Sequence, residues 1–150
     1  MEDLTLLPAQ LDALLTGENN TVANLSNASA LLMQTLPDLN WAGFYLFDEA
    51  ANDLVLGPFQ GKVACMHIAP GKGVVGASFD KKQVLVVPNV HEFAGHIACD
   101  SASNSEIVAP IVVDDKIVAI LDIDSPSLDR FSESDAAAIT EFAAVVAKHF

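Results

Sequence analysis

The chain has 150 residues, enough for one domain with a substantial hydrophobic core. Its hydrophobic content of 51% and mean hydropathy of +0.37 exclude a disordered chain. The net charge of −13, with only seven lysines and arginines, excludes nucleic acid and an anionic membrane surface as partners, because both require clustered basic side chains. No apolar run approaches the roughly 20 residues that span a bilayer, and the acidic N-terminus is unlike a signal peptide. We therefore expect a single domain over residues 1–150, located in the cytoplasm.

The first forty residues are expected to form two helices. An apolar-rich segment over residues 4–15 stops near Gly17. A second segment, which begins after residues 18–21, carries apolar side chains at steps of three and four up to Leu36. This spacing places them on one face of a helix, and Pro37 ends that helix.

The centre of the chain is predicted to be rich in strands. Two apolar runs separated by a polar turn predict a β-hairpin, and a β-branched run further on predicts another strand. A turn containing proline and glycine leads into a short helix. These elements are expected over residues 41–47 and 54–59 for the hairpin, 64–68 for a third strand, 74–79 for the helix and 84–87 for a fourth strand.

The last third begins with a segment that has no clear period. Residues 89–105 are predicted to form a loop with one helical turn, and a loop of this length inside a compact domain is usually functional. Residues 107–113 and 117–121 predict a second hairpin that is apolar on both faces and therefore central in its sheet. Residues 132–135 resemble a helix N-terminus and open the last helix. The whole order predicts an α+β domain in which helices pack on an antiparallel sheet.

Two acidic residues follow the last apolar strand. Asp122 and Asp124 are two positions apart, so on a strand their side chains point to the same face. In a partly buried site, mutual repulsion and desolvation would keep at least one of them protonated near neutral pH. A neutral carboxylic acid can donate a hydrogen bond to a polar oxygen. The spacing alone also allows both acids to lie exposed at the end of the strand.

The two cysteines, Cys65 and Cys99, are the other reactive candidates. In the cytoplasm both thiols would be reduced, so a disulfide between them would be transient and catalytic, while two inert buried cysteines remain the alternative. Asp100 would raise the pKa of the neighbouring Cys99 thiol, so attack would need local support, for example from His96, or a substrate activated by proton donation. A zinc site made of the cysteines with His91 and His96 is disfavoured by the ligand spacing. We expect no metal.

Two further motifs have ordinary structural explanations. Gly71, Gly73 and Gly76 match the letters of a dinucleotide fingerprint, but they precede only a short helix and lack the βαβ setting. We interpret them as turn and packing glycines and expect no cofactor. Trp41 and Tyr45 are typical core residues, although a tryptophan beside a hairpin can also form the wall of a small pocket.

Taken together, several segments resemble the free methionine-(R)-sulfoxide reductases, which have the GAF fold. The combination of Gly-Pro-Phe-Gln-Gly at residues 57–61 with His-Ile-Ala-Cys-Asp at residues 96–100 is highly specific, since plain GAF domains need neither. The resemblance implies a GAF-like α+β domain whose central antiparallel sheet of about six strands is flanked by N- and C-terminal helices. The matching segments are residues 40–46, 57–62, 64–65, 71–74, 90–91, 95–100, 103–107 and 121–125.

The resemblance also implies a role for each candidate residue. Cys99 would attack the sulfoxide sulfur, while Glu106, Asp122 and Asp124 would bind the substrate and polarise the sulfoxide oxygen. Methionine would leave, and Cys99 would become a sulfenic acid. Cys65 would resolve that species as a disulfide, which thioredoxin would reduce.

The substrate implied by the family is free methionine sulfoxide, not a residue within a protein, and a closed pocket would explain this choice. Trp41 and Tyr45 are candidates for packing against the thioether methyl group and hence for binding substrate. The family allows a homodimer, which the sequence itself does not show.

The sequence departs from the family at one position. Many members carry a third cysteine where this chain has Val75, so we expect a simple cycle through Cys65 and Cys99. Two other functions are alternatives. A non-enzymatic GAF sensor is disfavoured because the chain lacks the Asn-Lys-Phe-Asp-Glu pattern of cyclic-nucleotide GAF domains. The other alternative is a redox-sensing scaffold whose disulfide changes its choice of partner.

Overall fold

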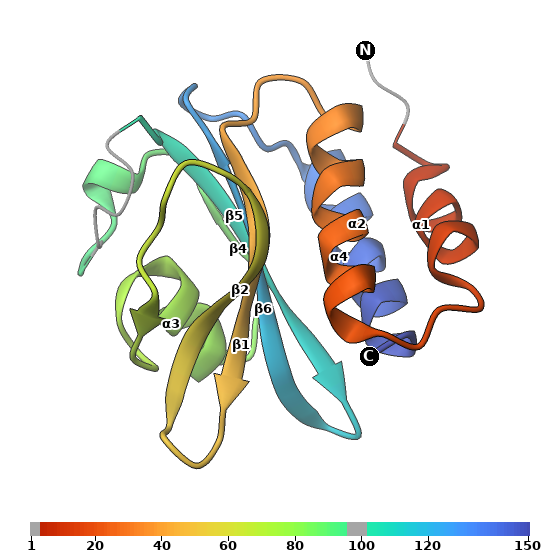
Figure 1. Ribbon diagram of the computed structural model, residues 1–150. Helices are drawn as coiled ribbons and strands as arrows, with labels where there is room; N and C mark the ends of the chain where they lie inside the picture. The colour runs from red at the N-terminus through yellow and green to blue at the C-terminus, as the bar shows by residue number, and fades with distance from the viewer. Residues whose placement is uncertain (1–3, 96–101) are drawn as a thin grey trace.

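A computed structural model describes residues 4–95 and 102–150. Within these ranges the chain forms an α+β fold in which a six-stranded antiparallel sheet lies between two layers of helix (Figure 1). The elements in chain order are α1 (Leu7–Leu15), α2 (Thr21–Thr35), β1 (Trp41–Asp48), β2 (Asp53–Gly61), β3 (His67–Ile68), α3 (Gly73–Lys81), β4 (Leu85–Val87), the 3₁₀ helix η1 (Val90–Glu92), β5 (Ser105–Val113), β6 (Lys116–Ser125) and α4 (Glu133–Lys148).

The strand order is β3-β2-β1-β6-β5-β4. Each of the two predicted hairpins forms, β1 with β2 and β5 with β6, and the two are joined by antiparallel pairing of β1 with β6. Strands β1 and β6, which belong to different hairpins, therefore lie side by side at the centre of the sheet. The prediction that the second hairpin is central is confirmed, and so is the α+β class with an antiparallel sheet.

The two faces of the sheet carry different side chains. Helices α2 and α4 cover one face, with α1 packed on their outer side, and α3 lies on the other face (Figure 1). Alternation along β1 sends Ala42 and Phe44 into the core under the three helices, while Trp41 and Tyr45 enter a smaller cluster on the α3 side. The sheet therefore separates a large apolar core from a face on which aromatic and acidic residues meet.

The predicted third strand was wrong over most of its length. Only His67–Ile68 pairs with β2 as a strand, and residues 64–66 do not, although the Met66 carbonyl still accepts a hydrogen bond from the Leu56 N–H at 2.9 Å. The Cys65 carbonyl instead accepts a hydrogen bond from the Tyr45 hydroxyl group on β1, so this part of the backbone is directed toward β1.

The glycines near residue 71 have the structural roles that the sequence indicated. Gly71 and Gly73 have φ angles of +85° and +60°, which favour glycine, and they form the turn that enters α3. A Cβ atom at Gly76 would lie 2.6 Å from the carbonyl oxygen of Ala69, so the close packing of α3 requires glycine there.

The start of α4 is held by a capping box. Ser132 accepts a hydrogen bond from the backbone N–H of Asp135, and the Asp135 carboxylate accepts one from the N–H of Ser132. Arg130 also donates to the Asp135 carboxylate at 3.1 Å. The predicted N-terminus of the last helix is thereby confirmed.

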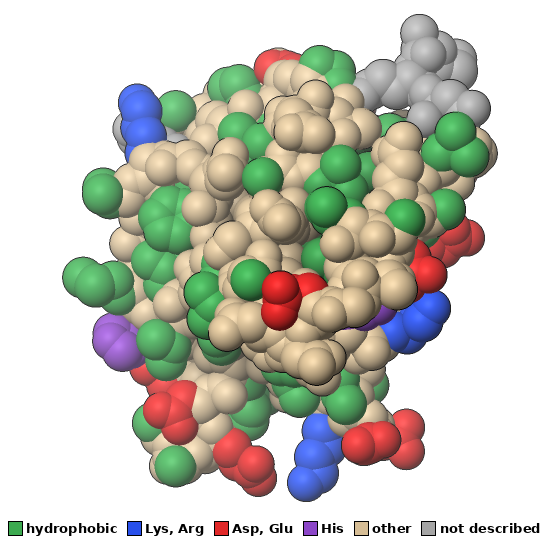
Figure 2. All heavy atoms as spheres, turned by 45° about the vertical axis from the view of Figure 1, so that its right-hand side comes forward, with side chains coloured by type: hydrophobic (Ala, Val, Ile, Leu, Met, Phe, Trp, Pro, Cys, Tyr) green, Lys and Arg blue, Asp and Glu red, His purple; other side chains and the backbone are tan. Residues whose placement is uncertain are grey.

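The outer surface agrees with the acidic composition. On the face shown in Figure 2, lysine and arginine side chains stand singly among acidic and apolar ones. Within the described ranges, none of the helices combines the length and apolar content that crossing a bilayer would require.

Candidate active site

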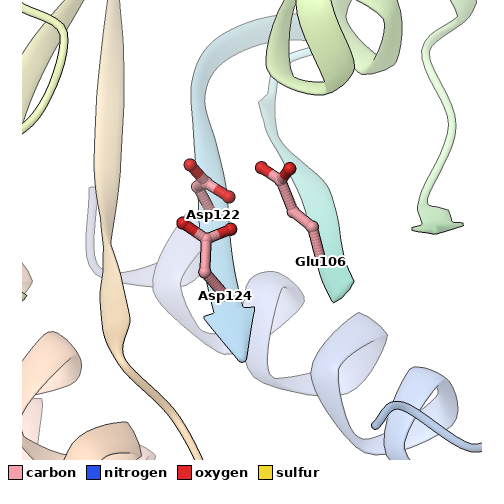
Figure 3. Close-up of side chains that lie close together, drawn as sticks. All are labelled: Glu106, Asp122 and Asp124. Carbon is pink, nitrogen blue, oxygen red and sulfur yellow. The ribbon is translucent and has the colours of Figure 1, made fainter. Parts of the chain in front are cut away.

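Three carboxyl groups converge on the α3 side of the sheet. Asp122 and Asp124 extend from β6 and Glu106 extends from β5, with their carboxyl groups turned toward one another (Figure 3). One oxygen from each group lies within 4.8 Å of the others. We call these three residues the acid cluster and their side of the sheet the acid face. The prediction that Asp122 and Asp124 share a face is confirmed.

A β-bulge brings Glu106 into this cluster. The β5–β6 hairpin begins with Val113 opposite Lys116, and its register shifts by one residue between Ile111 and Val112. The shift places Glu106 opposite Asp124, and opposite residues of an antiparallel pair point to the same face. Without the bulge, Glu106 would lie opposite Ile123 and would point into the core under the helices.

Most of the acid cluster is removed from solvent. Glu106 is 7% exposed and Asp122 is 6% exposed, while Asp124 is half-buried, so the alternative that both aspartates lie open at the end of a strand is wrong. Burial, and then the charges of Asp122 and Asp124, raise the pKa of Glu106 well above its usual value. Burial also raises the pKa of Asp122, against the effect of its hydrogen bonds to Glu106 and Asp124. The cluster therefore retains protons at a pH where exposed carboxyl groups are ionised.

This arrangement can donate a proton or a hydrogen bond to a ligand. The Oδ1 atom of Asp122 is buried and has no hydrogen-bond partner among the described residues. Three oxygens at this spacing would fit around a divalent cation, since such ions bind oxygen at about 2.0–2.6 Å. A cation would have to displace the protons that burial retains, so proton donation is the chemistry that the cluster favours.

Trp41 and Tyr45 lie beside the acids on the central strand β1. Trp41 is opposite Asp124, and Gly43 is opposite Asp122. The Trp41 and Tyr45 rings stack with centroids 6.0 Å apart, and each residue is only 2% exposed. Burial, followed by the charges of the three acids, raises the pKa of Tyr45. Both aromatic residues are therefore core residues that also border the cluster.

Phe59 and two glycines complete this wall, and the sequence alone indicated no role for them. Phe59 stacks on Trp41 with centroids 5.1 Å apart. A Cβ atom at Gly43 would lie 2.2 Å from the Cβ atom of Phe59, and one at Gly61 would lie 2.5 Å from the Trp41 ring. The available signal was that all three positions lie in segments that match the family.

The two predicted catalytic cysteines differ in what the structure describes. Cys65 is half-buried in the connection between β2 and β3 and is disulfide-bonded. It packs against the smaller apolar cluster on the acid face, the one that contains Trp41 and Tyr45. Cys99 lies outside the described residues, as does His96. Val75, at the position of the family's third cysteine, is 3% exposed on α3 and belongs to the same cluster.

Polar side chains fix the chain where it enters β5. Asn40 donates a hydrogen bond to Ser103 at 3.1 Å, and Nε2 of His91 lies 2.8 Å from the side-chain oxygen of Asn104. Asn104 in turn donates to the carbonyl of Pro126 at 2.6 Å. These contacts tie the start of β5, and hence Glu106, to the end of β6. The four side chains all belong to segments that match the family, although nothing in their spacing indicated this function.

A cavity of about 560 Å³ lies at the opposite end of the sheet. It opens where the pairing of β1 with β6 ends, at Leu46 opposite Ala119. None of the predicted site residues that the structure describes lines it, so it is separate from the acid cluster. Its walls include Phe47, Phe79, Lys82, Lys116 and Ile117.

Comparisons with known proteins agree with this architecture. A family model described as the GAF domain matches residues 20–150. The free methionine-R-sulfoxide reductase of Escherichia coli is 49% identical over 142 residues, which cover 95% of this chain and 85% of that relative. The reduced form of fRMsr of Staphylococcus aureus superimposes with a TM-score of 0.94 at 47% identity, over 99% of this chain and 96% of that one.

A second solved structure shows the same similarity with a ligand present. The free methionine-R-sulfoxide reductase from Neisseria meningitidis, in complex with its substrate, has a TM-score of 0.96 at 38% identity, over 100% of this chain and 92% of that one. These alignments cover nearly the whole chain, at sequence identities of 38% to 49%. The chain therefore belongs to the GAF domain family, within its group of free methionine-R-sulfoxide reductases.

Proposed function

We propose that this protein reduces free L-methionine-(R)-sulfoxide to L-methionine by thiol chemistry. The observation that carries the proposal is the buried acid cluster, whose raised pKa values keep a proton donor beside the connection that contains Cys65. A sulfoxide is a poor electrophile until its oxygen is protonated or hydrogen-bonded, so a neutral carboxyl group is what this reaction needs. The names of the relatives and the substrate complex of one of them support the choice of substrate.

In the first step, the Cys99 thiol attacks the sulfoxide sulfur while Glu106, Asp122 and Asp124 polarise the oxygen. The attack forms a bond between the two sulfur atoms. This bond and the sulfur–oxygen bond of the substrate then break as the oxygen passes to the Cys99 sulfur, and methionine leaves as the reduced thioether. The oxygen ends on Cys99 as the hydroxyl group of a sulfenic acid, so that sulfur has lost two electrons. Trp41 and Tyr45 would provide the apolar wall against which the thioether methyl group packs.

In the second step, the Cys65 thiol displaces the hydroxyl group of the sulfenic acid as water and forms a disulfide with Cys99. The disulfide-bonded state of Cys65 fits this resolving role. Thioredoxin would then return both thiols by dithiol–disulfide exchange, which suits a reducing compartment such as the cytoplasm. A homodimer stays a prediction from the family, and so does the extent of the domain over the full 150 residues.

The direct test is NADPH consumption coupled to thioredoxin and thioredoxin reductase, with the R and S epimers of free methionine sulfoxide offered separately. We expect consumption with the R epimer only. If protein with confirmed reduced thiols consumes NADPH with neither epimer, the reductase assignment is wrong. Ligand binding without turnover would then favour a GAF sensor.

Cysteine variants test the two steps separately. Cys99→Ser is expected to abolish turnover. Cys65→Ser is expected to allow one methionine per protein but to block cycling through thioredoxin. Full steady-state activity of Cys99→Ser would refute the mechanism, and normal cycling of Cys65→Ser would move the resolving role to an external thiol.

A further inference from the structure

The connection between β2 and β3 is held by two side chains on β1. Within this connection, Val63 is 87% exposed, and Lys62 is also exposed. Yet Nε1 of Trp41 donates a hydrogen bond to the Lys62 carbonyl oxygen at 3.1 Å, and the Tyr45 hydroxyl donates one to the Cys65 carbonyl oxygen at 2.9 Å. An otherwise open segment is thereby fastened at its first residue and at its cysteine.

These two hydrogen bonds are strongly required by the burial of their donors. Trp41 and Tyr45 are each 2% exposed, so neither the indole N–H nor the phenol O–H can turn to bulk water. A buried donor without an acceptor is destabilising, and tryptophan and tyrosine usually find a partner when buried. The carbonyl groups of Lys62 and Cys65 are those partners. The position of the connection and the positions of the two rings therefore fix each other.

The same two residues place the connection next to the acid cluster. They are four positions apart on one strand, so both point to the acid face. Trp41 lies opposite Asp124 in the sheet, and Gly61, just before the connection, lies opposite Trp41. The start of the connection is thereby aligned with the end of β6 that carries the acids.

We propose that Tyr45, assisted by Trp41, is a positioning residue for the resolving thiol: its hydroxyl group holds the Cys65 backbone so that Cys65 is presented to the oxidised site. This inference rests on the proposed function and deepens it. It assigns the hydroxyl group of Tyr45 to the disulfide-forming step, whereas a ring that packs against the substrate methyl group would act in the first step. The hydroxyl and the ring can be separated experimentally.

The test compares wild type with Tyr45→Phe, which keeps the ring and removes only the hydroxyl group. With reduced protein, one equivalent of the R sulfoxide and no reductant, the rates of methionine formation and of disulfide formation are measured separately, and methionine formation is expected to change less than disulfide formation because the ring of residue 45 is kept. Loss of the second thiol, that of Cys65, occurs only when the disulfide forms, and it is expected to slow by roughly tenfold, the effect of one lost hydrogen bond. Dimedone is expected to trap more sulfenic acid in the variant, as measured by mass spectrometry.

Two controls separate positioning from a general structural effect. Ser29→Ala removes another buried hydroxyl group, which donates to the Leu25 carbonyl within α2 at 2.8 Å and also lies 3.3 Å from the Pro58 carbonyl of β2, and it is expected to leave both rates unchanged. Trp41 is the only tryptophan in the chain, so its fluorescence reports on this connection. Tyr45→Phe, but not Ser29→Ala, is expected to shift its emission to longer wavelength as the connection loosens.

The outcomes are distinct. Disulfide formation at the wild-type rate in Tyr45→Phe, or a parallel fall in methionine formation, would overturn the proposal. A wild-type protein that releases no methionine from either epimer would instead refute the proposed function. In that case hydrogen peroxide replaces the sulfoxide, because it oxidises a thiolate to a sulfenic acid and leaves as water. Slower disulfide formation in Tyr45→Phe would then still support the positioning role, and equal rates would overturn it.

Discussion

Replacing Glu106 by glutamine should make the protein more stable and less active. Glutamine has nearly the shape of a protonated glutamate, so it can occupy the same space on β5 without an ionisable group. In the wild type, the folded state binds a proton that the unfolded chain would release above its ordinary pKa of 4.5. The stability that Glu106 contributes is therefore fully present below about pH 4.5 and is lost as the pH rises through its raised pKa in the folded state.

The magnitude follows from the geometry of the acid cluster. At the 4.8 Å that bounds the three oxygens, one ionised pair is repelled by about 3 kcal/mol at an effective dielectric constant of about 20. Three such pairs would amount to roughly 10 kcal/mol, comparable to the whole stability of a domain, so the cluster must retain protons to stay folded. Each pH unit over which Glu106 stays protonated in the folded protein, while the unfolded chain would release the proton, costs about 1.4 kcal/mol.

The assay is thermal unfolding of wild type and Glu106→Gln between about pH 4.5 and 7.5, with the cysteines of both proteins in the same state. The midpoints should be similar at the acid end, and the variant should unfold at a higher temperature by roughly 3–6 °C for each pH unit over which Glu106 stays protonated in the folded wild type. Glu141→Gln, on an exposed position of α4, serves as the matched control and should show no such divergence. A difference between wild type and Glu106→Gln that stays constant or shrinks with rising pH would refute the reasoning.

Two other predictions follow from the same geometry. Glu106→Gln and Asp124→Asn should each slow methionine formation in a single turnover by roughly a hundredfold or more, because a positioned acid contributes about 10²–10⁴-fold. The wild-type rate of that step should fall as the pH rises through the raised pKa of Glu106, and normal rates in both variants would remove these acids from the chemistry. Gly43→Ala should lower stability to urea by about 1–3 kcal/mol, because the new Cβ atom would lie 2.2 Å from the Cβ atom of Phe59. An unchanged urea midpoint would show that β1 and β2 absorb the side chain without strain.

The sequence was sufficient to predict most of the helices and strands and part of the candidate active site. Hydrophobic periodicity and turn residues located the two hairpins, and period-two alternation alone placed Asp122 and Asp124 on one face. These are local properties, because each depends only on residues close together in the chain. The failure at residues 64–66 had a non-local cause, since the apolar side chains there resemble a strand while the Cys65 carbonyl is held by the hydroxyl group of Tyr45, which is distant in the chain.

The approach of Glu106 to the aspartates could not be predicted from the residues alone. It depends on a one-residue register shift between Ile111 and Val112, and although Pro110 directly before Ile111 is compatible with a bulge, a proline does not specify where the register shifts or by how much. Regular pairing from the turn at Asp114 and Asp115 would have pointed Glu106 into the helix-covered core. The family resemblance grouped the three acids, but the register explains how they meet.

The contrast between the two faces of the sheet explains how a small domain can contain such a cluster. On β1 and β6, the residues that alternate with Trp41, Tyr45 and the aspartates are apolar, and they pack against three helices on the opposite face. That larger core stabilises the same strands that must hold buried acids close together. Replacing one acid of the cluster by its amide, as in Glu106→Gln, would make the protein more stable at neutral pH, but it would remove the retained proton. The unfavourable burial of these carboxyl groups is therefore inseparable from their ability to act as acids, and substitutions chosen for stability alone should accumulate at the positions that the reaction requires.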